Sequence, residues 1–106
     1  MVFGVKWRKG ELNQMQKESI IQTNKEICYI CGQYATERHH CLHGTANRKL
    51  ADEDGLTVML CRRCHMNLHD KGTCDKELQK IAQRVYMRHY HKTVEDFIKR
   101  YGKSYI

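Results

Sequence analysis

Residues 61–69 read CRRCHMNLH and place two kinds of metal ligand in one short segment. Cys61 and Cys64 form a CxxC pair that matches an earlier pair, Cys28 and Cys31. Structural zinc takes four soft ligands in a closed tetrahedron, and four thiolates provide them. The segment therefore predicts a zinc site that joins two parts of the chain that are distant in sequence.

Four histidines beside these cysteines form a second group. His65 and His69 are four positions apart, so on a helix they project from one face. His39 and His40 are adjacent, and on a strand they point to opposite faces. One of this pair can then complete a three-histidine metal site while the other acts as a general base. The alternative is four ordinary surface histidines, which the zinc staple beside them disfavours.

Composition limits the class of protein. The 106 residues make one small domain, residues 1–106, with a modest core that a metal would help to hold together. No apolar run reaches the roughly 20 residues of a membrane span, and the N-terminus lacks the apolar segment of a signal peptide. We expect no membrane association and a cytoplasmic location, in the bacterial host cytosol if the protein is phage-encoded.

The charge balance points to a polyanionic partner. Lys and Arg number 19 against 12 Asp and Glu, a formal charge of +7. Such a balance favours nucleic acid, and the basic residues bracket the Cys and His motifs. The alternative is a surface charge that only keeps the protein soluble.

The six cysteines could instead form three disulfides, with 15 possible pairings. CxxC spacing is poor for a structural disulfide framework, but its two sulfurs converge readily on one ion. We therefore favour zinc over disulfides. Cys41 and Cys74 are left over, and we expect them to be free thiols.

The apolar pattern predicts a mixed fold with a small central unit. A strand, a loop, a second strand and a helix are expected over residues 28–71, and Gly32 allows the tight turn after Cys31. Helices are expected to flank this unit at 11–26, where the residues are polar and favour a helix, and at 73–101. Thr73 could cap the first C-terminal helix, and Thr93 with Asp96 suits a capping box for the last. The expected segments are a strand or arm at 1–10, a helix at 11–26, strands at 37–42 and 56–60, a loop at 43–55, and helices at 61–71 and over 73–101.

Residues 28–69 resemble an HNH endonuclease of the ββα-metal class (the His-Me finger) with an added two-CxxC zinc knuckle, of the type found in phages and mobile elements. The stretches that carry the resemblance are CYICG, ERHH and LTVMLCRRCHMNLH. The resemblance implies a small α+β fold and a metal-dependent DNA endonuclease. It assigns His40 as the general base, and His39, His65 and His69 as ligands of one catalytic divalent metal, Mg²⁺, Mn²⁺, Ni²⁺ or Zn²⁺.

One part of the family pattern is missing. A middle Asn usually stands near the start of the second strand, where this chain has Asp54-Gly55-Leu56. Asn47 earlier in the expected loop could replace it, or Asp52 or Asp54 could hold the backbone.

The remaining candidates are less specific. Candidate phosphate contacts, which could equally be solvated charges, are Arg48, Lys49, Arg62 and Arg63. His43 could line the site, but a surface position on the loop is the simpler expectation. His89 and His91 are expected to be exposed at the end of a helix.

Three functions of different classes fit these features. The first is a metal-dependent DNA endonuclease. The second is a non-catalytic zinc-knuckle module that binds DNA, and the third is a phage-encoded factor that binds a protein partner through its helical flanks. Only the first requires His40 for activity.

Overall fold

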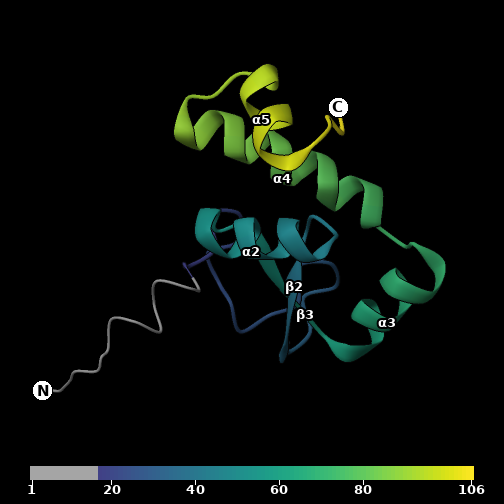
Figure 1. Ribbon diagram of the computed structural model, residues 1–106. Coiled ribbons are helices and arrows are strands. Elements are labelled where there is room, and N and C mark those ends of the chain that lie inside the picture. The colour runs from purple at the N-terminus through teal and green to yellow at the C-terminus, as the bar shows by residue number, and fades with distance from the viewer. Residues whose placement is uncertain (1–16) are drawn as a thin grey trace, which may run out of the picture.

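The computed structural model describes residues 17–106, which form a mixed α+β fold with a two-stranded sheet and four helices (Figure 1). In Figure 1, α2 lies between the sheet and a layer made by α4 and α5, and α3 lies to one side. No helix in this part of the chain is long and apolar enough to cross a bilayer. The elements are β2 (Glu37–His40), α2 (Thr45–Asp54), β3 (Thr57–Leu60), α3 (Arg62–Lys71), α4 (Asp75–Tyr90) and α5 (Val94–Tyr101).

The sheet is an antiparallel pair with a short, defined register. Glu37 pairs with Leu60 at one end, and His40 pairs with Thr57 at the other. Three of the four residues of β3 are buried, so this strand contributes to the core. Both expected strands are present, each slightly shorter than the sequence suggested.

The segment between the strands is a helix, and the expected loop at 43–55 is wrong. Residues 45–54 include Ala, Arg, Lys, Leu and Glu, which are good helix formers. Arg48, Lys49 and Glu53 are exposed to solvent. Ala51 is fully buried in the core. Gly55 ends α2 in the left-handed conformation and donates its N–H to the Ala51 carbonyl.

The expected N-terminal helix is wrong where it can be compared. Its first part, 11–16, and the strand or arm expected at 1–10 lie outside the described residues, and 17–26 contain no helix. The hydroxyl of Ser19 donates to the Thr57 carbonyl and accepts from the amides of Ile21 and Gln22. Such local side-chain bonds compete with helix formation, so this segment docks along β3 instead.

The two C-terminal helices form the second layer of the fold, as expected. Leu78, Ala82 and Tyr86 of α4 are buried, and the Tyr86 ring meets Phe97 of α5 edge-on at 5.6 Å. The capping box is confirmed: the Thr93 hydroxyl accepts from the Asp96 amide, and the Asp96 carboxylate accepts from the Thr93 amide. Helix α4 begins later than expected, at Asp75, so Thr73 does not cap it.

Asp54 fixes this layer to the end of α2. The Arg100 guanidinium donates to both Asp54 carboxylate oxygens, at 2.6 and 3.0 Å, and the Tyr101 hydroxyl donates to the same group at 2.6 Å. Bidentate pairs of this kind are among the stronger polar contacts in proteins. The network positions α5 against α2, so the role of Asp54 is to join the two layers.

Candidate metal centres and the histidine cleft

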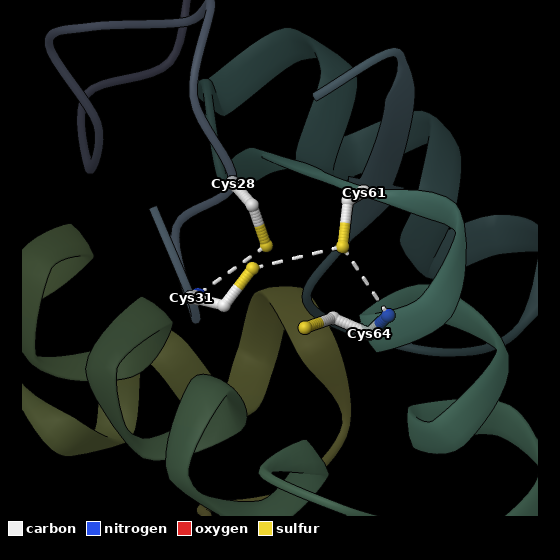
Figure 2. A group of neighbouring side chains, drawn as sticks. All are labelled: Cys28, Cys31, Cys61 and Cys64. Carbon is white, nitrogen blue, oxygen red and sulfur yellow. Dashed lines mark hydrogen bonds between the residues drawn. The ribbon is translucent and has the colours of Figure 1, made fainter. Parts of the chain in front are cut away.

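The four cysteines of the CxxC pairs meet at one point, as Figure 2 shows. Their sulfurs lie within 4.8 Å of one another, and the Sγ atoms of Cys31 and Cys61 are 3.7 Å apart. Zinc–sulfur bonds of about 2.3 Å in a tetrahedron place sulfurs about 3.8 Å apart. The spacing therefore fits a closed zinc site.

Each pair is built by a local turn that aims amides at sulfur. In the first, Gly32 has a φ of +82° and donates its N–H to the Cys28 carbonyl, and the Cys31 amide donates to Cys28 Sγ. In the second, Cys61 caps α3, and its sulfur accepts from the Cys64 amide at 3.5 Å. Amide donors stabilise thiolates, which are the form that binds metal.

The electrostatics of the cluster also favour bound cations. Burial alone would raise the pKa of the Cys28 thiol, but hydrogen bonds from backbone amides, those of Cys31 and Cys61 foremost, lower it to about 6. Burial, and then the neighbouring sulfurs, raise the pKa of Cys64 to about 12. The Cys28 thiolate thus forms more easily than the Cys64 thiolate, and a bound dication would stabilise both.

All six cysteines lie among the described residues, and none of them forms a disulfide. Cys41 is fully buried, and that burial raises its pKa to about 12. Cys74 is half-buried in a left-handed conformation just before α4. Neither lies in the four-cysteine cluster.

A second cluster joins β2 to α3 through three imidazoles. His65 Nε2 lies 3.1 Å from His69 Nε2 and 3.3 Å from His39 Nδ1. His65 and His69 share one face of α3, and β2 brings His39 to meet them. The three expected ligand residues therefore converge, within 4.8 Å of one another.

A carboxylate determines which nitrogen of His65 faces this group. Glu37 Oε1 lies 2.8 Å from His65 Nδ1, and its other oxygen accepts from Arg62. Because a carboxylate only accepts, the proton of a neutral His65 ring is on Nδ1. Its Nε2 lone pair then faces His39 and His69, which is the arrangement a metal ligand needs.

His39 is the buried member of the group, with 2% of its surface exposed. Burial and then the nearby imidazoles, His65 foremost, lower its pKa to about 3, so its ring is neutral near pH 7. Its Nε2 is buried without a hydrogen-bond partner among the described residues. The His39 nitrogen that faces the cluster is Nδ1, and a neutral imidazole is the form that binds metal.

His40 is held by different partners from its neighbour, as strand alternation predicted. Its Nε2 lies 2.9 Å from Asp52 Oδ1, and the same oxygen is 2.6 Å from Arg38 Nη2. The carboxylate places the proton of a neutral His40 on Nε2, which leaves Nδ1 as the acceptor. Asp52 on α2, within the expected loop, thus contacts His40, whereas Asn47 donates to the Tyr101 carbonyl.

One cleft of about 260 Å³ contains all of these histidines. His43 also lines this cleft. Its side chain is 43% exposed, so it lies at the surface, as expected, and at the edge of the cleft as well. Its Nε2 pairs with Asp75 at the start of α4, 2.7 Å away. The lining residues are Arg38, His39, His40, His43, Arg48, His65 and His69.

The four candidate phosphate contacts lie in different places. Arg48 lines the histidine cleft, whereas Lys49 is exposed on α2. Arg62 is paired with Glu37, and Arg63 lies against the sulfurs of Cys64 and Cys31, which raise its pKa. Only Arg48 of this group directly faces the histidines.

The sequence reasoning missed the carboxylates that orient the histidines. Glu37 had a local signal, because it stands two positions before His39 and shares its strand face. Asp52 was considered only as a support for the backbone and Asp75 was not considered, because their contacts with histidines depend on how α2 and α4 pack. His89 and His91 are exposed, as expected.

The two centres differ in chemistry. The thiol site is closed and suited to a structural ion, while the imidazole site opens on a cleft with further polar groups. Comparisons of the chain with protein-family models, with curated proteins and with solved structures found no match. What the centres do must therefore be inferred from their own residues.

Proposed function

We propose that this protein is a metal-dependent DNA endonuclease, with a structural zinc at the four cysteines and one catalytic divalent ion at the three histidines. The observation that carries the proposal is the pairing of two different histidines on one strand. His39 joins the cluster with His65 and His69. His40 lies in the same cleft but contacts the Asp52 carboxylate instead. That division supplies a metal site and a separate base.

The order of elements supports the ββα-metal architecture as the framework of this site. Strands β2 and β3 form the hairpin, α2 lies in the connection, and α3 follows β3 directly. The cysteine cluster holds the start of α3 against the segment before β2. In this proposal zinc fixes the distance between the strand histidines and the helix histidines.

The chain's own residues would handle the proton. His40 Nδ1 would accept a proton from the attacking water, and Asp52 would stabilise the resulting imidazolium through Nε2–H. Glu37 would keep the His65 lone pair aimed at the ion. A bound divalent ion supplies Lewis acidity for the charge that develops on the phosphoryl and leaving oxygens. Three imidazoles favour borderline ions such as Zn²⁺ or Ni²⁺ over Mg²⁺.

DNA is proposed as the substrate because the cleft and the whole chain are basic. Arg38 and Arg48 stand at the histidine cleft, and the formal charge is +7. Phosphate contacts of this kind give affinity without reading a sequence. We therefore expect weak sequence preference.

The direct test is incubation of zinc-loaded protein with supercoiled plasmid, with each of Mg²⁺, Mn²⁺, Ni²⁺ and Zn²⁺ added in turn. Nicking that requires an added ion, and that stops when the ion is chelated, supports the proposal. DNA binding without nicking under every condition would contradict it and favour a non-catalytic zinc-knuckle DNA-binding module.

A further inference from the structure

A second cleft lies directly beside the histidine cleft. It has a volume of about 240 Å³, and it shares Arg38 with the first cleft. The segment before β2 forms one wall, and β3 forms the floor. The residues that line it are Lys17, Glu18, Ser19, Gln22, Lys25, Arg38, Thr57, Val58 and Met59.

Two uncharged polar side chains of this cleft, Ser19 and Gln22, are already used by the fold. The Ser19 hydroxyl bonds three backbone groups, as described above. The Gln22 side chain donates to the Ile27 carbonyl and accepts from the Met59 amide. A ligand in this cleft would therefore have to be recognised by the charged side chains.

The three cations of the cleft keep spare donors. Lys17 Nζ donates to the Tyr90 hydroxyl at 2.7 Å, which occupies one of the three hydrogens of an ammonium group. Arg38 meets Asp52 through one nitrogen, and a guanidinium has five N–H donors. Within residues 17–106 Lys25 pairs only with Glu18, whose side chain is 87% exposed, and such surface pairs are weak. An anionic ligand can compete for all three.

We propose that this second cleft is a phosphate subsite that binds a backbone phosphodiester next to the one in the histidine cleft. The inference rests on the proposed function, because the ligand is the same nucleic-acid strand. Arg38 lies between the two clefts and contacts the Asp52 carboxylate that also holds His40. The occupied subsite thus sets how far the strand enters and which linkage reaches His40.

The test couples one lysine to one phosphate. His40→Ala protein, which leaves DNA intact, is titrated with short labelled duplexes in which a single linkage is a neutral methylphosphonate, and the position of that linkage is moved along each strand. The same series is repeated with Lys25→Gln added, and with Lys80→Gln as the control, since Lys80 is exposed on α4 and lines neither cleft. Inorganic phosphate is included as a competitor to distinguish a strand phosphate from a free one.

The expected result is one linkage position at which the methylphosphonate weakens binding to the His40→Ala protein but not to the His40→Ala protein that also carries Lys25→Gln. The coupling should be about threefold or more, Lys25→Arg should restore it, and Lys80→Gln should leave it unchanged. The subsite would be overturned if the methylphosphonate reduced DNA affinity by the same factor with and without Lys25 at every position. It would also be overturned if inorganic phosphate bound the cleft as well as the DNA strand does. Failure of the endonuclease proposal would be seen in a different experiment, the plasmid assay, in which the wild-type protein would not nick DNA.

Discussion

Glu37 on β2 and His65 on α3 are joined by a 2.8 Å contact between Oε1 and Nδ1, which fixes the direction of the imidazole lone pair. The other carboxylate oxygen accepts from Arg62, between the two cysteines that begin α3. One glutamate therefore connects the strand, the zinc knuckle and the histidine cluster. The two candidate metal centres are linked through this contact.

Glu37→Gln should weaken the catalytic site without unfolding the protein. The amide replaces a charged acceptor with a neutral one, so Nδ1–H is held less firmly. Ni²⁺ affinity of the zinc-loaded protein, measured by calorimetry, should fall about 10- to 100-fold. Arg62→Gln is the matched control, because it removes only the other partner of the carboxylate, and its Ni²⁺ affinity should stay near that of wild type. Equal affinities for Glu37→Gln and wild type would show that this contact does not orient a ligand.

Asp52→Asn should separate base orientation from metal binding. The substituted amide no longer stabilises an imidazolium at His40, so plasmid nicking at saturating metal should fall about tenfold or more. Ni²⁺ affinity should be unchanged, because Asp52 does not contact the three-histidine cluster. Glu53→Gln is the control, since the neighbouring carboxylate pairs with Arg100 on the surface. If Asp52→Asn and Glu53→Gln nick at equal rates, Asp52 has no role in the reaction.

Cys61→Ser should remove the structural zinc and destabilise the fold. Zinc binding in such sites is itself folding free energy, so the free energy of unfolding should drop by several kcal/mol. Elemental analysis should find one zinc per chain in wild type at this site and in Cys74→Ser, the control that changes a cysteine outside the cluster. Well-folded wild-type protein that contains no zinc would refute the structural site.

Binding to DNA should weaken steeply as salt rises. Each phosphate contact contributes a slope of about −0.9 to the plot of log affinity against log salt concentration for a duplex. Arg48→Ala should reduce the slope by about one, because Arg48 lines the histidine cleft, while Lys80→Ala should leave it unchanged. A flat salt dependence would instead point to a protein partner.

The candidate metal ligands could be proposed from the sequence because part of their geometry is local, whereas the meeting of the two CxxC pairs and of the strand and helix histidines depends on tertiary contacts. A CxxC turn and two histidines four apart on a helix require no knowledge of the rest of the chain. Thr93 and Asp96 were predictable for the same reason, since a capping box closes within one turn.

The rest depended on tertiary contacts. Residues 45–54 looked like a loop because they include Asn and Asp, but they form an amphipathic helix in which Ala51 and Asp54 are buried while Arg48, Lys49 and Glu53 are exposed. Residues 17–26 looked helical, but the backbone of Ile20 bonds the Gly55 carbonyl instead of its own segment. A Cβ at Gly55 would lie 2.6 Å from the Glu18 carbonyl, so this close approach requires glycine there. These partners are distant in sequence, and periodicity does not report them.

The most direct test of the central claim compares His40→Ala with His65→Ala in the plasmid assay over a wide range of added metal. We predict that both fold and keep the structural zinc. His40→Ala should lose about two to four orders of magnitude in nicking rate at every metal concentration, because added ion cannot replace a proton acceptor. His65→Ala should lose activity through weaker metal binding and recover part of it as metal rises. Nicking by His40→Ala at the wild-type rate would contradict the assignment of base and ligand, and with it the proposed endonuclease.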